Sequence, residues 1–429
     1  MTTGYDMTAC CHGSPGPEGQ RLEGDSHRHP AGDWKPRPRV CVIGAGLAGL
    51  VTGKVMKLDG FRVTVFEREP EPGGVWSSSR GYPGLRANTP REAYAFSDYP
   101  YPADADDFPT AAQVRSYLNA YMDHFGLRRL LKLSTEVQSV SRLGGSEDGP
   151  GSFEVTFTPP DSETPRSRRY DFVVVCSGTF SQPHVPPLPG QERFEGTVCH
   201  SSDFLDSEIA EGKRVVVVGG GKSALGCAAS LAPHTRKLTL VCRSPHWMVP
   251  RHFPGGIRMD RLFLTRFAEL LLPPYYRPGS PPGSPPGSGG WARSPGSLLR
   301  WMTSPLLRLW WAAQTRLIPR LVGMPPSLVP ESALPEGLER SGVGTEFFRK
   351  AREGHAHVER SEIECFTGGD TLRLESGRTI RADLVILATG WHQEFPLLDD
   401  EVGGQVSRNG RVNLFRRILP PEEPRLGFS

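Results

Sequence analysis

Residues 39–49 read RVCVIGAGLAG and residues 214–224 read RVVVVGGGKSA. In both stretches a short apolar run ends in a glycine-rich turn, and such a run is typical of a buried parallel strand. Each turn opens into a helical stretch, from Leu47 to about Leu58 and from Ser223 to about Leu231. The repeated order of strand, glycine turn and helix predicts two dinucleotide-binding units in one chain.

The glycines of the first turn have separate tasks. Gly44 allows the tight turn, Gly46 lets backbone amides approach a pyrophosphate, and Gly49 lets the helix pack on the strand. The next apolar run, residues 61–66, ends at Glu67, about the distance from the glycines at which an acid meets a ribose hydroxyl. Strand, helix and acid in register indicate a nucleotide site rather than a chance glycine turn.

The second unit repeats this pattern with one difference. Its next strand, residues 238–242, ends at Arg243 instead of an acid. A guanidinium can pair with a 2′-phosphate, which favours NADPH over NADH, although a solvated surface arginine is the alternative. The Gly-Lys-Ser sequence suggests a nucleotide triphosphatase, but Val216 stands where that loop needs glycine.

A third motif lies between the two units. Residues 194–204, FEGTVCHSSDF, fit F-x-G-x-x-x-H-x-x-x-F/Y, with Phe194, Gly196, His200 and Phe204 at the fixed positions. This motif resembles the fingerprint of the flavin-containing monooxygenases and their N-hydroxylating and Baeyer-Villiger relatives. Other segments resemble that family too, and together they cover residues 39 to about 428: PGGVW at 72–76, NTP at 88–90 with FSDYP at 96–100, SGTFSQP at 177–183 and ATGW at 388–391.

The resemblance implies an α/β fold of two nested, Rossmann-like dinucleotide-binding domains, with mixed sheets and smaller antiparallel meanders. We expect a disordered N-terminal extension at 1–38 and the first part of an FAD-binding domain at 39–190. An NADPH-binding domain follows at 191–350, with a mobile Pro/Gly/Ser-rich loop at 278–297, and residues 351–429 return to the FAD domain. Family members usually continue past a strand like residues 424–428, so we expect a C-terminally short member whose flavin site lacks that cap.

The resemblance also implies roles for single residues. FAD would be bound by Gly44, Gly46, Gly49, Glu67, Gly74 and Trp76. NADPH would be bound by Ser202, Gly219, Gly221, Ser223 and Arg243. Val137 and Gly390 are expected to bind a cofactor, without assignment to one of the two. Asn88 is the candidate catalytic residue, because its amide both donates and accepts, although Asn-Thr-Pro could also be a turn before a helix. His200 is expected to lock the cofactor and the linker rather than act as a general base, and no metal site is expected.

The implied activity is NADPH- and dioxygen-dependent oxygenation of a nucleophilic nitrogen or sulfur of a small molecule, through C4a-hydroperoxyflavin in a dry pocket. A YUCCA-like, auxin-type decarboxylating monooxygenase stays open, as does a Baeyer-Villiger enzyme, although those typically have tryptophan where Phe204 stands. Disulfide reductases share the nested fold but need a cysteine pair, which does not follow the first turn. From another class, a catalytically silent dinucleotide-binding protein is the alternative.

Composition agrees with this interpretation. With 429 residues the chain is long enough for two cores, and its net charge of +3 shows no excess suited to nucleic acid. Eight cysteines without a C-x-x-C pair favour a reducing compartment, so a cytoplasmic protein is expected, or one peripheral on an intracellular membrane. Residues 1–38 lack the apolar core of a secretory signal; a transit peptide is disfavoured by their acids but stays open.

The remaining elements follow from periodicity. Thr110 begins a predicted helix with an apolar stripe that ends at Phe125. Strands are predicted at 135–140, 153–157 and 170–176, and a similar set at 361–366, 371–375 and 382–388 suggests linkers that carry the chain out to the second domain and back. Apolar helices are predicted at 262–272 and 298–317. The second has too many arginines and a proline to span a membrane; it would rest on a membrane surface, form the substrate entrance or, as we favour, pack on the NADPH domain.

Overall fold

The computed structural model describes residues 37–144, 151–263, 265–266, 295–334, 341–408 and 411–429. Nearly all of the predicted N-terminal extension and most of the predicted Pro/Gly/Ser-rich loop lie outside these residues. So does most of the helix predicted at 262–272, apart from the short α5 (Asp260–Phe263).

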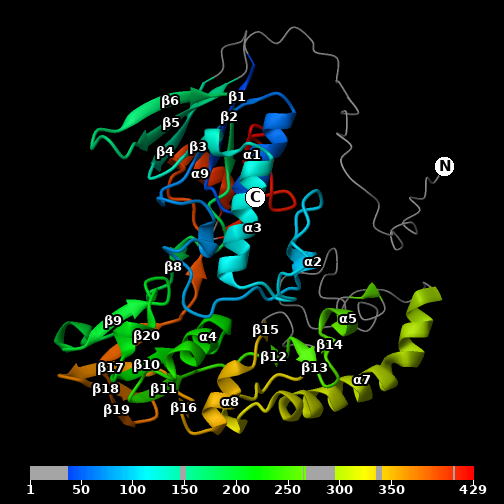
Figure 1. Ribbon diagram of the computed structural model, residues 1–429, viewed down its shortest axis with the longest axis vertical. Coiled ribbons are helices and arrows are strands. Elements are labelled where there is room, and N and C mark those ends of the chain that lie inside the picture. Colours follow the sequence, from blue (N-terminus) through cyan, green and yellow to red (C-terminus); the bar gives the residue numbers. More distant parts are fainter. Residues whose placement is uncertain (1–36, 145–150, 264, 267–294, 335–340, 409–410) are drawn as a thin grey trace. The chain divides into compact units, whose positions relative to one another are not determined.

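The first glycine turn belongs to a five-stranded parallel sheet. Its order is β24-β7-β1-β2-β3, from Leu426–Phe428, Phe172–Val175, Arg39–Ile43, Arg62–Phe66 and Leu131–Lys132. The side chains of β1 alternate between two cores. One face packs on α1 (Leu47–Leu58) and α3 (Ala111–His124), and the other on an antiparallel meander, β4 (Glu136–Leu143), β5 (Ser152–Thr158) and β6 (Arg166–Tyr170) (Figure 1).

The predicted helix after the asparagine segment forms as expected. Thr110 caps α3, accepting a hydrogen bond from the Gln113 backbone N–H at 3.2 Å, while the Gln113 side chain accepts from the Thr110 N–H at 3.0 Å. This reciprocal pair satisfies donors that would otherwise be left at the helix start. The apolar stripe of α3 is buried against the first sheet.

The second glycine turn belongs to another five-stranded parallel sheet. Its order is β16-β11-β10-β20-β9, from His357–Glu359, Lys237–Val241, Arg214–Val218, Leu384–Leu387 and Thr197–His200. One face packs on α4 (Lys222–Leu231), α8 (Glu346–Arg352) and the C-terminal half of α7 (Pro295–Val322). The other packs on a second meander, β17 (Ile363–Gly368), β18 (Thr371–Leu374) and β19 (Thr379–Arg381). The predicted fold class is confirmed, and we call the parts built on the two sheets the first and second lobes.

The chain crosses between the lobes twice. It leaves after β7 through β8 (Gln182–Pro183) and returns after β20 through β21 (Trp391–His392), and the two short strands pair antiparallel. The expected return at residue 351 is therefore wrong. Residues 357–387 still add β16 and β20 to the second sheet, because parallel pairing with β11 and β10 buries their apolar side chains.

Short elements complete the description. They are η1 (Gly74–Trp76), α2 (Arg91–Tyr94), η2 (Arg128–Leu130), η3 (Gln191–Arg193), η4 (Ser207–Ala210), β12 (Met248–Val249), β13 (His252–Phe253), β14 (Ile257–Arg258), η5 (Pro326–Leu328), β15 (Gly342–Val343), α9 (Asp400–Val406), β22 (Ser407–Arg408) and β23 (Arg411–Val412).

Helix α7 covers the apolar stretch predicted at 298–317 and continues through two prolines, Pro305 and Pro319. Trp311, Ile318 and Val322 are buried in the core of the second lobe, as favoured from the sequence. Leu309 and Trp310 of the same helix are exposed. None of the helices in the described ranges combines the length and the apolarity that crossing a membrane requires.

An arginine ties the central strands of the second sheet together. The backbone N–H and the Nε of Arg214 donate to one carboxylate oxygen of Asp383 at 2.7 and 3.0 Å, and Nη2 donates to Asp370 at 2.8 Å. The bonds from Arg381 and Arg214 lower the pKa of Asp370 to about 2, and the bonds from Arg214 lower the pKa of Asp383 to about 2. These contributions are present above the usual carboxyl pKa and are lost as the pH falls toward 2.

We predict that Arg214→Met lowers the free energy of unfolding at pH 7 and weakens its decline between about pH 4 and pH 2, because the Asp383 pKa returns toward its ordinary value near 3.9. Urea unfolding of both proteins at several pH values measures this. Arg373→Met, which removes the exposed Arg373–Glu364 pair of the same lobe, is the matched control and should change little. An unchanged acid dependence in Arg214→Met would contradict the assignment.

Candidate active site

A cavity of about 550 Å³ opens at the carboxyl end of β1. Five of the six residues that the sequence assigns to FAD line it, namely Gly44, Gly46, Glu67, Gly74 and Trp76, and so does Val137, which was expected to bind a cofactor. The sixth, Gly49, packs behind the turn instead. Strand β4 supplies Val137, the first crossing supplies residues 176–182, and residues 394–397 after the second crossing close the wall.

The first turn has no room for side chains at two of its glycines. Gly44 has φ +106°, and a Cβ there would lie 2.4 Å from the carbonyl oxygen of Cys176. A Cβ on Gly49 would lie 1.8 Å from the carbonyl oxygen of Gly44. Close packing of turn on helix leaves the backbone of residues 46–48 at the cavity, where their amides can bind a pyrophosphate.

Glu67 is fixed at the end of β2. Its side chain is 7% exposed, and its two carboxylate oxygens accept from the backbone N–H of Ala45 at 2.7 Å and of Glu69 at 3.1 Å. Each oxygen keeps a second acceptor position. The carboxylate therefore faces the cavity in a defined orientation, where a ribose hydroxyl can donate to it.

A second cavity, of about 1020 Å³, lies between the lobes. It is lined from the second lobe by the β10–α4 turn and Arg243, from the first lobe by Asn88, and from the fingerprint and return linker by Ser202 and Gly390. All the residues predicted to bind NADPH border it: Ser202, Gly219, Gly221, Ser223 and Arg243. Gly390, which was expected to bind a cofactor, borders it as well. The two cavities share a wall of Val75, Trp76, Arg80, Tyr94 and Phe180, so molecules bound in them would meet there.

His200 connects the fingerprint to the return linker. It is 3% exposed, its Nε2 lies 3.2 Å from the carbonyl oxygen of Gly390, and its Nδ1 lies 3.1 Å from the backbone N of Ser202 and 3.0 Å from the Ser202 hydroxyl. Burial lowers the pKa of His200, which favours the neutral ring. Nε2–H then donates to the carbonyl oxygen while Nδ1 accepts, so the ring is held as a structural link.

The other fingerprint residues serve packing. Phe204 is fully buried in the core of the second lobe, and Phe194 packs on Phe366 with ring centroids 4.7 Å apart. A Cβ on Gly196 would lie 2.6 Å from the Phe194 ring and from the carbonyl oxygen of Asp383. These three residues of the motif therefore pack the start of the second lobe and take no part in binding or catalysis.

Comparison with known proteins decides the family. A family model described as flavin-binding monooxygenase-like matches residues 37–275, more than half of the chain. The chain belongs to the flavin-binding monooxygenase-like family. It is thus an FAD-containing, NADPH-dependent monooxygenase.

Individual relatives agree with this family. The chain is 29% identical over 435 residues to the probable flavin-containing monooxygenase 1 of Arabidopsis thaliana, covering 91% of this chain and 77% of that protein. It is 28% identical over 401 residues to the N-oxide-forming dimethylaniline monooxygenase 2 of Mus musculus, covering 90% and 68%. The structure of S-allyl-L-cysteine S-oxygenase from Allium sativum shares the fold, with a TM-score of 0.55, 20% identity, and 92% and 72% of the two chains covered.

The cofactors of this monooxygenase family fit the two cavities. We assign FAD to the first cavity, where the turn is closed to side chains and Glu67 offers a ribose acceptor. We assign NADPH to the second cavity, since a Cβ on Gly219 would lie 2.5 Å from the carbonyl oxygen of Ala388 and the turn again exposes its amides. The shared wall then lies where the flavin and the nicotinamide would approach each other.

Arg243 lines the second cavity together with a carboxylate, that of Glu362. Its side chain is 71% exposed, and Nη1 lies 3.2 Å from a carboxylate oxygen of Glu362, which lines the same cavity. A 2′-phosphate bound by Arg243 would meet the negative charge of Glu362. This carboxylate therefore weakens the phosphate preference that the sequence suggests.

Arg80 and Lys222 also border the site, although the sequence assigned neither of them to a cofactor. Arg80 lines both cavities, donates to the carbonyl oxygen of Phe180 at 2.8 Å and lies over the Trp391 ring. Lys222 lines the second cavity, and burial lowers its pKa. Arg80 sits in a serine-rich loop without a pattern, whereas Lys222 was visible inside the second glycine turn.

We predict that Gly49→Ala yields protein that retains little FAD, because the new Cβ overlaps the Gly44 carbonyl oxygen and must open the turn. Flavin absorbance per polypeptide of the purified protein measures this. Gly404→Ala, at an exposed position of α9 where a Cβ meets nothing within 4 Å, is the control and should retain flavin. Full flavin content in a folded Gly49→Ala protein would disprove the assigned cradle.

A second prediction concerns the choice of nucleotide. Arg243→Ala should raise the KM for NADPH about ten-fold and change the KM for NADH little, because a charge-assisted hydrogen bond is lost. Glu362→Gln should lower the KM for NADPH, since a repulsive charge leaves. Steady-state kinetics with both nucleotides measure these effects, and equal changes for NADPH and NADH would remove the phosphate assignment.

Proposed function

We propose that this monooxygenase places one oxygen atom from dioxygen on a nucleophilic nitrogen or sulfur of a small molecule. The observation that carries the proposal is the pair of cavities that share a wall, the second of which is lined by Asn88. Reduced flavin supplies the oxygen-activating chemistry when bound. The residues of the chain supply position, hydrogen bonds and protection from water.

The side chain of Asn88 is free to act on a ligand. Asn88 follows the buried Ala87 and precedes Pro90, the N-cap of α2, so its backbone is held on both sides. Within the described part of the chain, the Asn88 amide has no hydrogen-bond partner, and it borders the second cavity. An amide in this position can donate to a developing negative charge and accept from a substrate N–H.

Aromatic side chains line the two cavities and would limit the access of water. Trp76 is buried, and its Nε1–H donates to the Tyr94 hydroxyl at 2.7 Å, with the rings edge to face. Phe180 and Trp391 form a second edge-to-face pair. An apolar enclosure favours reactions whose intermediates water would discharge.

The activities for which related proteins are named support nitrogen or sulfur as the acceptor. The Mus musculus relative is named for N-oxide formation, and the Allium sativum protein of shared fold is an S-oxygenase. A Baeyer-Villiger or decarboxylating reaction would use the same cofactors, and ketone and 2-oxoacid substrates are therefore arms of the same assay.

The decisive experiment incubates the FAD-loaded protein with NADPH, dioxygen and a panel of thioethers, tertiary amines, ketones and 2-oxoacids. We expect NADPH consumption to rise with a thioether or an amine and the product to gain the mass of one oxygen atom, with little free hydrogen peroxide. Lactone or decarboxylated product would replace the proposal by one of the alternatives. Nucleotide binding without any product would favour the silent dinucleotide-binding protein.

We predict that Asn88→Ala lowers the rate of oxygenated product about 10²-fold, the typical effect of removing one hydrogen-bond donor from an active centre, while the KM for NADPH changes little. Product formation and NADPH oxidation measured together test this. Asn119→Ala, on the exposed face of α3, is the control and should retain full activity. An unchanged product rate in Asn88→Ala would disprove the role of Asn88.

We propose two locations in the cell, the cytoplasm and the surface of an intracellular membrane. The six cysteines in the described ranges are free, which supports a reducing compartment such as the cytoplasm. Leu309, Trp310, Leu317 and Leu321 are exposed on α7, which supports peripheral contact with an intracellular membrane. Co-sedimentation with lipid vesicles distinguishes these two locations.

A further inference from the structure

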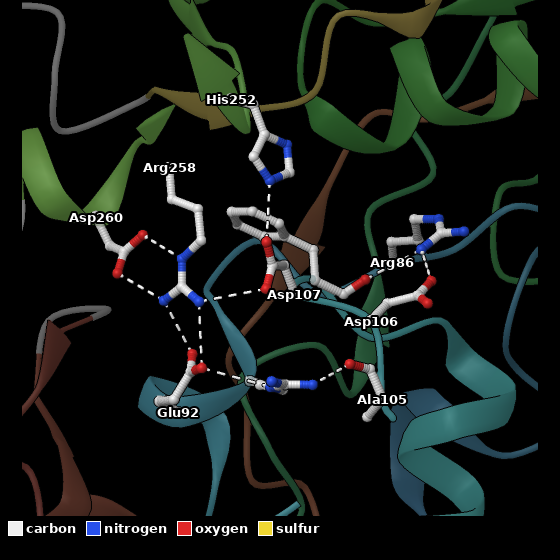
Figure 2. Close-up of polar contacts among 10 residues, drawn as sticks. Arg86, Glu92, Ala105, Asp106, Asp107, His252, Arg258 and Asp260 are labelled. Atoms are coloured by element: carbon white, nitrogen blue, oxygen red, sulfur yellow. Dashed lines mark hydrogen bonds and ion pairs between the residues drawn. The ribbon is translucent and has the colours of Figure 1, made fainter. Parts of the chain in front are cut away.

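An arginine of the second lobe contacts the loop that carries Asn88, residues 85–111. Arg258 lies on β14, and its guanidinium donates to both carboxylate oxygens of Glu92 on α2 at 3.1 and 2.9 Å and to Asp107 at 3.3 Å (Figure 2). It also donates to both oxygens of its neighbour Asp260 at 3.0 and 2.8 Å. These five bonds use all five N–H donors of a guanidinium.

Arg258 is the least exposed member of this ionic contact. Its side chain is 16% exposed, whereas those of Glu92 and Asp107 are 55% and 41% exposed, and the two carboxylates come from different parts of the loop. Hydrogen bonds from Arg258 lower the pKa of both Glu92 and Asp260. His252 of β13 adds a further contact to Asp107 at 3.2 Å.

An apolar contact lies beside the ionic one. Phe108 of the first lobe is 2% exposed and packs with Val249 and Met259 of the second lobe. The His252 ring meets the Phe108 ring edge to face at 5.5 Å, and the Arg251 guanidinium lies 5.8 Å from it. The loop is therefore docked on the second lobe by a buried side chain as well as by charge.

The loop transmits this docking to Asn88. Its two halves are bonded to each other, from the Arg91 N–H to the Asp107 carbonyl oxygen at 2.8 Å and from the Ala87 N–H to the Pro109 carbonyl oxygen at 2.9 Å. These two bonds bracket Asn88. Arg86, which lines the second cavity, also donates to Asp106 at 2.6 Å (Figure 2).

We propose that Arg258 is a positioning residue, which fixes Asn88 against the nucleotide turn of the second lobe through Glu92 and Asp107. This inference rests on the proposed function, since Asn88 acts in the second cavity. Without Arg258, the carboxylates of Glu92 and Asp107 would face Asp260 across the lobe boundary with no guanidinium between them. Their repulsion would move the loop away from the cavity while the nucleotide turn stays intact.

The test compares Arg258→Met, Arg258→Lys and Glu92→Gln with the wild-type holoenzyme. Hydrogen–deuterium exchange reports the loop, residues 85–111, without any substrate, and product formation per NADPH consumed reports the position of Asn88. We expect Arg258→Met to increase exchange in this loop and to lower product per NADPH about ten-fold, with released hydrogen peroxide making up the difference. The KM for NADPH should stay near the wild-type value.

The other variants keep the proposal testable if Arg258→Met folds poorly. Arg258→Lys keeps the charge but loses the forked geometry, so it should recover part of the coupling. Glu92→Gln removes one partner and should shift exchange and coupling in the same direction by less. Arg373→Met, which breaks the exposed Arg373–Glu364 pair, is the matched control and should change neither.

Three outcomes overturn the inference. Unchanged exchange at 85–111 in Arg258→Met shows that Arg258 does not hold the loop. Increased exchange with unchanged product per NADPH shows that Arg258 is merely structural. If the wild-type protein forms no product, the proposed function fails and the positioning role falls with it, whereas the exchange data still decide whether Arg258 docks the loop.

Discussion

The fold depends on a close backbone approach that both lobes share. The first glycine of each turn lies against a carbonyl oxygen of the neighbouring strand's continuation: Gly44 against Cys176, and Gly219 against Ala388. A Cβ would come within 2.4 and 2.5 Å of these oxygens, and both glycines have positive φ. Only glycine permits this spacing, and it lets the amides of each turn face a cavity.

Both carbonyls belong to residues at which the chain leaves one lobe for the other. Cys176 follows β7 on the way out, and Ala388 follows β20 on the way back. Each nucleotide turn is thus packed directly on a linker. The linkers pair with each other through β8 and β21, and His200 bonds to the return linker at Gly390. The two cofactor sites and the two chain crossings are therefore packed and hydrogen-bonded to one another.

This arrangement explains why the chemistry is expected at the lobe boundary. Each cavity alone offers what a nucleotide needs, namely amides, a small set of polar partners and an apolar lining. Only their shared wall brings the two bound groups together, and Asn88 lines the second of the two cavities. A catalytic position between two lobes requires a fixed orientation of one lobe relative to the other. Charge-assisted hydrogen bonds such as those of Arg258 can fix this orientation, because their strength depends on geometry as well as on charge.

The sequence by itself determined the elements with local signals. Strands β1 and β10 form over the predicted residues, because their unbroken apolar runs can only be buried, and α3 begins at its predicted cap because Thr110 and Gln113 satisfy each other locally. The two glycine turns predicted the positions of both nucleotide cavities. Weak signals were missed: β6 is largely arginine and exposed, and β19 is three residues long.

Only the tertiary structure decided which elements pair and which charges meet. Strand β16 joins the second sheet beyond the predicted boundary, because pairing with β11 depends on a partner more than a hundred residues away. Arg80, the Arg243–Glu362 pair and the Arg258 contacts belong to loops and short strands without periodicity. Hydrogen bonding and burial of such side chains depend on non-local geometry, which neither spacing nor composition encodes.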